Sequence, residues 1–195
     1  MTKKQAFRIY IVNTLTVLWM LTISSTYFGY YIIQNITVSN KSTMTMAGTF
    51  AGVAIAYFIK KRKNILLLRK YLVTLMVMAV VFQCAIAVSL LYDPFMSGII
   101  NTLFGATIWV LASAVEADLW NHIYTGSERT QIDNTISLYQ KVAMCVGSST
   151  VLIIDSFHCV SVTEIAYGSV IIVIIEVLLK YFSIRVLESV PKEIE

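Results

Sequence analysis

The sequence predicts an all-α polytopic membrane protein with six transmembrane helices, and three observations point to that fold class. The chain is 57% hydrophobic and only 13% charged, whereas soluble domains carry about 25% charged residues. Six apolar runs each approach the roughly 20 residues that a helix needs to cross a hydrocarbon core of about 30 Å. None of them alternates strictly between apolar and polar residues, so helices are favoured over the closed barrel that lipid also permits.

The first three runs cover residues 9–33, 43–59 and 71–92. The first is too long for a cleavable signal peptide, and no small-residue cleavage site follows it. The second is the shortest and contains Gly48 and Gly52, a spacing of small residues that lets two helices pack closely. The third ends at the Asp93-Pro94 pair, which predicts a helix end because proline cannot continue the hydrogen-bond ladder.

The last three runs cover residues 98–120, 132–154 and 165–187. The loops between runs are short, so the sequence predicts a single transmembrane domain over residues 1–195 and no soluble domain. In the sixth run Glu176 and Lys180 are four residues apart, a spacing that predicts an ion pair on one helix face. Polar residues within the other runs predict hydrogen bonds between helices.

The basic residues predict that both termini are cytoplasmic. Loops on the cytoplasmic side of membrane proteins are enriched in Lys and Arg. With six spans, thirteen of the 15 basic residues fall on the side of the termini, and only Lys41 falls on the other side. The remaining one, Lys141, lies inside the fifth run. The net charge of +4 therefore follows from topology, and nucleic acid is not needed to explain it.

Lys141 is the leading candidate for a functional residue. A charge at bilayer depth costs at least about 2.5 to 3.5 kcal/mol, and chains keep it where it faces a bundle interior or a water-filled path. Ser137 lies four residues before Lys141 and so shares its helix face. The alternative is that Lys141 extends along the helix to the interface, as long basic side chains do.

Three further charges surround the cytoplasmic end of the fourth run. Glu116 and Asp118 lie at its end, and Arg129 follows in the next loop. One of the two acids is expected to pair with Lys141 or Arg129, and interfacial solvation is the alternative. At the opposite end of the first run, Tyr27 and Tyr31 share a helix face. They predict either an interfacial aromatic belt or a stacking face for a ligand.

No residue pattern predicts an enzyme, a cofactor or a metal site. The three cysteines have no metal-binding spacing, and zinc-peptidase, serine-hydrolase and nucleotide-binding motifs are absent. A cysteine peptidase built on the two histidines is a weaker hypothesis, because residues adjacent in sequence rarely form a nucleophile and base pair. Any transport is therefore expected to proceed without ATP hydrolysis by this chain.

Several segments together resemble one family of transporters. They are DLWNHIYTGSER at residues 118–129, ISLYQK at 136–141, GSS at 147–149, YFGYY at 27–31 and FIKKRKN at 58–64. Together they resemble one six-helix half, best the C-terminal one, of the glycoside–pentoside–hexuronide:cation symporters of the major facilitator superfamily. Their order along the chain is the order in that half. The resemblance implies half of a facilitator-type bundle, with Asp118, Arg129, Tyr139 and Lys141 along a solute pathway. The family has twelve helices and carries acidic residues in its second helix, which this chain lacks.

These observations predict a half-size transporter subunit in a bacterial-type plasma membrane. Facilitator halves are parallel repeats, so a homodimer or a second six-helix half would complete the pathway for a small polar solute. Two alternatives remain. One is an accessory, immunity or assembly subunit that does not transport, and the other is the vitamin-binding component of an energy-coupling-factor transporter.

Overall fold

The computed structural model describes residues 2–124 and 126–190, and every regular element in these ranges is helical. The predicted all-helical architecture is therefore confirmed for this part of the chain. The helices are α1 (Lys3–Asn35), α2 (Val38–Ile59), α3 (Arg62–Lys70), α4 (Leu72–Tyr92), α5 (Pro94–Phe104), η1 (Gly105–Trp109), α6 (Val110–Ile123), α7 (Gly126–Phe157) and α8 (Val162–Glu188).

Within the described residues, five helical segments are long and apolar enough to cross a membrane. They are α1, α2, α4, the continuous segment from α5 to α6, and α7. These five cover the first five predicted runs, and α8 covers the sixth with a helix of 27 residues. The chain thus has the helices of a multi-pass membrane protein, while a total of six spans stays a prediction.

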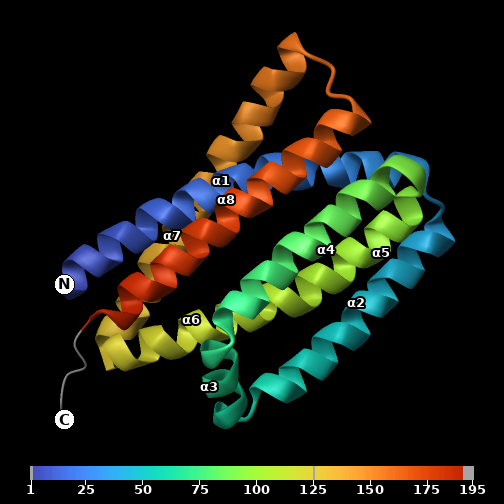
Figure 1. Cartoon of the computed structure of the whole chain (residues 1–195). Coiled ribbons are helices and arrows are strands. Elements are labelled where there is room, and N and C mark those ends of the chain that lie inside the picture. The colour runs from blue at the N-terminus through green and yellow to red at the C-terminus, as the bar shows by residue number, and fades with distance from the viewer. Residues whose placement is uncertain (1, 125, 191–195) are drawn as a thin grey trace.

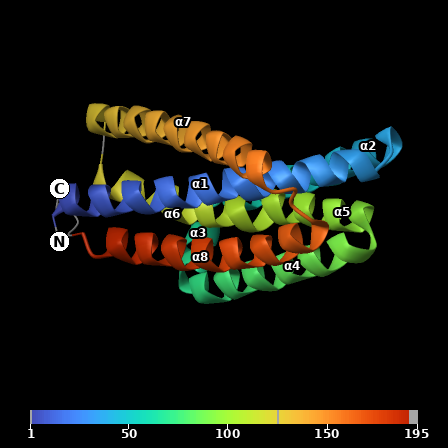
Figure 2. The ribbon, with the colours of Figure 1, turned by 90° about the horizontal axis from the view of Figure 1, so that it is seen from above.

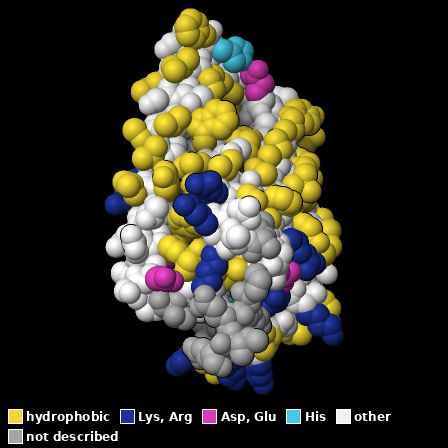
Figure 3. Space-filling model, turned by 90° about the vertical axis from the view of Figure 1, so that its left-hand side faces the viewer, with side chains coloured by type: hydrophobic (Ala, Val, Ile, Leu, Met, Phe, Trp, Pro, Cys, Tyr) yellow, Lys and Arg dark blue, Asp and Glu magenta, His cyan; other side chains and the backbone are white. Residues whose placement is uncertain are grey.

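The helices run side by side with their ends gathered at two poles (Figure 1). The start of α1 and the end of α8 lie at one pole, together with the junction between α6 and α7. The turns from α1 to α2 and from α4 to α5 lie at the other. Seen from the first pole, Lys and Arg side chains gather over this end of the molecule and hydrophobic side chains cover much of the flanks (Figure 3).

The core lies between α1, α4, α5 and α8. Its most buried side chains include Ile86 and Leu90 of α4 and Ile184 of α8. Small residues such as Ala79 and Ala112, both fully buried, allow the helix backbones to approach closely. The apolar runs therefore pack on one another along one side of each helix.

By contrast, α2 and α7 are only partly covered by the rest of the chain. No described residue of α2 is buried, and α7 buries only Ile136, Ala143 and Gly147. Helix α7 packs mainly against α1 and lies at the outer edge of the bundle (Figure 2). Trp19 Nε1 donates a hydrogen bond of 3.0 Å to Thr150 Oγ1 across this contact. Each of these two helices thus leaves a long face unoccupied by its own chain.

The glycines predicted for helix packing have different surroundings. A Cβ atom on Gly48 would collide with Thr102 of α5, whereas none of the described atoms lies within 4 Å of a Cβ on Gly52. Gly48 therefore provides close packing within the chain, and Gly52 lies on the open face of α2. Gly147 allows a close approach of α7 to α1, since a Cβ atom there would lie 2.7 Å from Thr22 Cβ.

Two predicted loops are largely helical in the structure. Residues 60–70 contain α3, whose end is fixed to α8 by an ion pair of 2.7 Å between Arg69 Nε and Glu188 Oε1. This segment combines basic residues with a run of leucines, which is typical of a helix lying at a membrane interface. Residues 121–131 are also mostly helical, because α6 continues to Ile123 and α7 already begins at Gly126.

The fourth run is interrupted in its middle by a single π-helical turn. Asp93 accepts hydrogen bonds from the backbone N–H groups of Phe95 and Met96 and so begins α5, with Pro94 in its first turn. The predicted helix end at Asp93-Pro94 is therefore confirmed. After Phe104 the chain forms η1, then continues as α6. Such π-turns occur often at functional sites, and this one ends at Trp109.

Candidate functional site

A cavity of about 370 Å³ lies between α1, α6, α7 and α8, and charged side chains line it. We call it the Glu176 cavity. Its charged lining residues are Glu116, Arg129, Asp133, Glu176 and Lys180. The volume lies toward the lower end of the roughly 300–1,000 Å³ of small-molecule sites. Ionisable side chains inside a membrane bundle are expensive and mark substrate or ion paths, so this cavity is the leading candidate site.

Two ion pairs organise the cavity. Lys180 of α8 donates to the Glu116 carboxylate of α6, and the Glu116 side chain is only 7% exposed. Arg129 Nη2 lies 3.0 Å from Asp133 Oδ1, one turn further along α7. The sequence predicted that either Glu116 or Asp118 would pair with Lys141 or Arg129, and it predicted a Glu176–Lys180 pair. The structure shows instead that Lys180 bonds to Glu116, because α6 and α8 bring these two residues together.

Three buried polar atoms of the cavity lining have no hydrogen-bond partner among the described residues. They are Glu176 Oε2, Arg129 Nη1 and Trp120 Nε1. Glu176 and Trp120 are 3% and 2% exposed, so bulk water does not satisfy them. Each buried group without a partner costs about 1 to 3 kcal/mol, and more when it is charged. Their convergence on one cavity therefore points to a ligand or ordered solvent that completes the bonding.

Aromatic rings form one wall of the cavity. Tyr10 and Trp120 contact edge to face with ring centroids 4.8 Å apart, and the Arg129 guanidinium lies 6.0 Å from the centre of the Trp120 ring. Trp109 adds a third ring at the far end. The hydrogen bond of 2.9 Å from Asn13 Nδ2 to Ser183 Oγ joins α1 to α8 beside them. The wall is therefore held by contacts from three helices.

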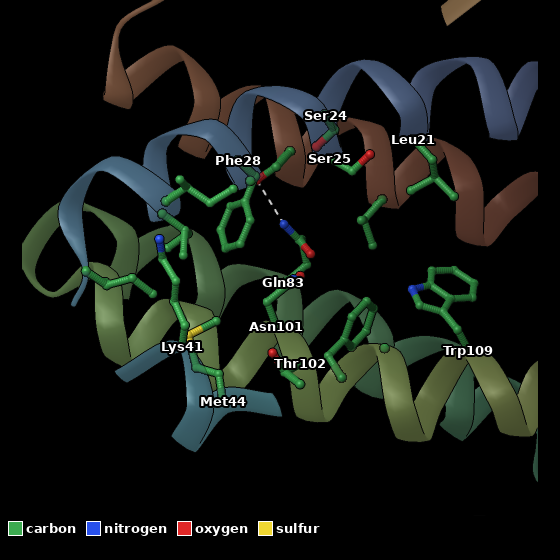
Figure 4. A pocket seen from close by; sticks show the side chains of 18 of the residues that line it. Leu21, Ser24, Ser25, Phe28, Lys41, Met44, Gln83, Asn101, Thr102 and Trp109 are labelled. Atoms are coloured by element: carbon green, nitrogen blue, oxygen red, sulfur yellow. Dashed lines mark hydrogen bonds between the residues drawn. The ribbon is translucent and has the colours of Figure 1, made fainter. Parts of the chain in front are cut away.

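A second cavity of about 500 Å³ lies toward the other pole, between α1, α2, α4, α5 and η1. We call it the Asn101 cavity (Figure 4). Asn101 and Gln83 extend into it from α5 and α4, and Lys41 reaches toward it from the start of α2. Gln83 Nε2 donates a hydrogen bond of 2.8 Å to Ser169 Oγ of α8. Amides and hydroxyls thus line this cavity together with apolar side chains.

Leu21 and Trp109 line both cavities. These two residues lie between the Glu176 cavity near the pole of the termini and the Asn101 cavity near the opposite pole, where Lys41 is the one charged lining residue. Trp109 is the last residue of the π-turn, where one extra residue is inserted in the helical ladder. A path through the chain would therefore pass between Leu21 and Trp109.

A third cavity of about 510 Å³ lies between α1 and the far end of α7, and Tyr27 and Tyr31 line it as two of the predicted site residues. The Tyr27 hydroxyl is buried there without a hydrogen-bond partner among the described residues. Asp155 and Cys159 lie on the opposite wall. The two tyrosines therefore line a concave surface, as a ligand-stacking face requires, but away from the charged cavity.

Apart from Arg129, the predicted residues of α7 lie outside the cavities. Ser137, Tyr139 and Lys141 are exposed, and none of them lines the three cavities described above. Asp118 is half-buried, and its carboxylate lies 3.8 Å from His122 Nδ1 rather than near Lys141. Of the predicted pathway residues, the Glu176 cavity thus brings together Glu116 and Arg129 only. In the single chain Lys141 faces outward from the bundle.

Sequence reasoning gave too little weight to Glu176, Lys180 and Trp120. Glu176 lies near the middle of the sixth run, deeper than Lys141 in its own run, and depth was the signal that could have identified it. The i, i+4 spacing to Lys180 suggested an internal pair that would have satisfied it. Only the packing of α6 against α8 shows that Glu116 takes this lysine.

Outside the predicted spans, two carboxylates are held in their charged form. The backbone and side chain of Ser161, followed by His158, lower the pKa of Glu164 to about 2 through hydrogen bonds at the start of α8. Burial would raise the pKa of Glu188, but hydrogen bonds from Arg69 and Arg185 outweigh it and hold this pKa below its ordinary value. Both groups therefore fix helix ends and lie apart from the cavities.

None of the protein-family models, curated proteins or solved structures compared with the chain matches it. The likeness to facilitator symporters therefore stays a prediction from sequence. Among the described residues, no group of three or more His, Cys, Asp or Glu side chains could hold a metal ion. The candidate site therefore consists of two ion pairs, an aromatic wall and unpaired polar atoms.

Proposed function

We propose that this chain is a half-size transporter subunit of a bacterial-type plasma membrane, and that it moves a small polar solute once a second copy has assembled beside it. The observation that carries the proposal is the Glu176 cavity, where five ionisable side chains meet inside a bundle of apolar helices. Two of these five, Glu116 and Glu176, are buried, and an ionisable side chain buried among apolar helices costs free energy, so chains keep it mainly where it serves a function.

The two cavities support a path along the bundle axis. The Glu176 cavity lies toward the pole of the termini, the Asn101 cavity lies toward the other, and Leu21 and Trp109 border both. Alternating access requires a site that opens to one side at a time, near the middle of the membrane. A small shift at the π-turn that carries Trp109 would connect the two chambers, since one extra residue already interrupts the helical ladder there.

The uncovered faces of α2 and α7 support the second copy. Helix α7 exposes Asn134, Ser137, Lys141 and Ser148, and a lipid-facing lysine at this depth is costly. The strong bias of basic residues toward one side gives each chain a single orientation. A parallel copy can therefore cover these faces, as the two halves of facilitator-type transporters do. A different six-helix chain would be an alternative partner.

Water access to the two cavities tests the path without knowledge of the solute. In a chain whose three cysteines are replaced by serine, Ser25→Cys reports on the Asn101 cavity and Ser113→Cys on the Glu176 cavity. Both positions are exposed lining residues. A membrane-impermeant thiol reagent should label position 25 from outside and position 113 from the cytoplasmic side. The control Val81→Cys, on an exposed apolar face of α4, should stay unlabelled from both sides.

If positions 25 and 113 resist labelling as firmly as position 81, the cavities are dry and the transport proposal is wrong. Native mass spectrometry of the purified chain in nanodiscs should show two copies per particle. A monomer that still transports would refute the assembled pathway. A particle containing a different six-helix chain would replace the homodimer by the alternative partner. Uptake assays in proteoliposomes then compare sugars, amino acids and organic cations.

A further inference from the structure

The charges of the Glu176 cavity do not balance. Its lining contains three carboxylates, Glu116, Asp133 and Glu176, and two cations, Arg129 and Lys180. Lys180 bonds to Glu116, and Arg129 bonds to Asp133. Glu176 is thus left as the one acid of this lining without a direct ion-pair contact among the described residues. Its Oε2 atom also lacks any hydrogen-bond donor there.

Nearby groups do not supply the missing donor. Glu176 is 3% exposed, so bulk water cannot surround it, and a buried carboxylate is stable only when a cation or several donors meet it. Lys180, four residues further along α8, donates instead to Glu116. Tyr10, which lies on the facing helix α1, packs its ring against Trp120 of α6. A positive group inside the cavity would therefore complete the site.

The remaining lining indicates what kind of cation fits. Tyr10, Trp109 and Trp120 line the cavity. The Trp120 ring stacks on Tyr124 and lies beside the Arg129 guanidinium, so Trp109, the least buried of the three, offers the open ring surface. Aromatic faces attract organic cations, with Trp the strongest. Small inorganic cations prefer several oxygen ligands at once, and the described residues contain no cluster of acids, histidines or cysteines that could hold a metal ion. An aromatic wall beside a single unpaired carboxylate instead suits an ammonium group that carries apolar substituents.

We infer that the Glu176 cavity binds a small organic cation, with the ammonium group of the ligand against the Glu176 carboxylate and its apolar part against the aromatic wall. The cavity volume of about 370 Å³ leaves room for a compact ligand. The inference names a substrate class for the proposed transporter. Its biological role therefore rests on the proposed function, whereas the binding does not. Binding itself can be measured on the isolated chain.

The test is a binding titration of the purified chain in nanodiscs at constant ionic strength. The probe is choline, and its uncharged isostere 3,3-dimethylbutanol is the matched control ligand. Two of the three tryptophans line the cavity, so intrinsic fluorescence provides the signal. We expect choline to bind at least tenfold more tightly than the alcohol, because only choline carries a positive charge that can pair with the Glu176 carboxylate.

Variants assign the effect to Glu176. Glu176→Gln should weaken choline binding at least tenfold, and Glu176→Asp should retain part of it. The control Glu128→Gln removes one negative charge from an exposed position outside the cavity lining, and it should change the affinity less than twofold. Gel filtration and melting temperature establish that each variant is folded. The comparison of choline with its isostere needs no variant and holds even if Glu176→Gln fails to fold.

Three outcomes would overturn the inference. Equal binding of choline and the alcohol would show that the charge is irrelevant, and sodium chloride that displaces choline at low concentration would indicate an inorganic cation site. A fluorescence change with pH that Glu176→Gln abolishes, without any choline binding, would show that a proton occupies Glu176. Because the labelling of positions 25 and 113 is independent of choline, failure of this ligand class and failure of the transport path are distinguishable.

Discussion

Removing either partner of the Glu116–Lys180 pair should destabilise the chain, whereas removing both should not. The two side chains are 7% and 19% exposed, so the pair is not screened by solvent as a surface ion pair would be. Breaking a buried pair from one side costs about 3 to 5 kcal/mol, because one charge stays buried without its partner. Replacing both partners by uncharged residues of similar size is often neutral.

The double-mutant cycle uses Glu116→Gln and Lys180→Met. We expect Lys180→Met to cost about 3 kcal/mol, because Glu116 cannot reach water. Glu116→Gln should cost less, about 1 to 2 kcal/mol, because the longer Lys180 is more exposed and can extend toward the cavity. The double variant should return to within about 1 kcal/mol of the parent, which gives a coupling free energy of several kcal/mol.

Unfolding of the purified chain by added denaturing detergent, followed by tryptophan fluorescence, measures these free energies. The reasoning fails if the single changes simply add, or if the coupling stays below about 1 kcal/mol as in exposed pairs. In that case the contact between Lys180 and Glu116 is not maintained in the bilayer. The two residues would then be free to bind a solute, and the charge count of the Glu176 cavity would have to be revised.

Two further predictions concern the helix ends and crossings. Gly147→Val should destabilise the crossing of α7 with α1 by about 1 to 3 kcal/mol, since its Cβ would lie 2.7 Å from Thr22 Cβ; Gly52→Ala, in open space, should change stability by less than about 1 kcal/mol. Glu164→Gln should lower the melting temperature at neutral pH. Because the folded-state pKa of Glu164 is depressed to about 2, its stabilisation is complete above the ordinary pKa of a glutamate and is lost as the pH falls from there through the folded-state pKa. The two melting curves should therefore converge near pH 2, and a constant difference from pH 7 to 2 would contradict the assignment.

The apolar runs were sufficient to predict the helices but not the surroundings of their polar residues. Every predicted run coincides with a helical segment of the structure, apart from Tyr71, which forms the turn before α4, because apolar length is a local property. Helix α3 was missed because four consecutive leucine or isoleucine residues between basic pairs do not form a span. A short amphipathic helix of this kind is stabilised by its tertiary contact, here the ion pair of Arg69 with Glu188.

The site was harder to predict because depth along a helix does not give the direction of a side chain. Helix α7 buries Ile136, Ala143 and Gly147, and Lys141 is five residues from Ile136. At 3.6 residues per turn this places Lys141 about 140° around the helix from Ile136. Which face of α7 packs on α1 is set by Gly147 and its neighbours, and this choice depends on two helices together. The same limit applies to Glu116, whose partner comes from α8.

The exposure of Lys141 is consistent with the proposed assembly of two chains. Its face of α7 is open, and neither residues 38–59 nor residues 134–154 contain an acid that a parallel copy could offer it. In a homodimer the lysine must then border water, and the water available at this depth is that of the proposed path between the two chains. Each chain would thus contribute Lys141 and Glu176, the one acid of the cavity lining without an ion-pair contact among the described residues. The proposed path would then carry both a basic and an acidic group, and Glu176 would stay available to a cation.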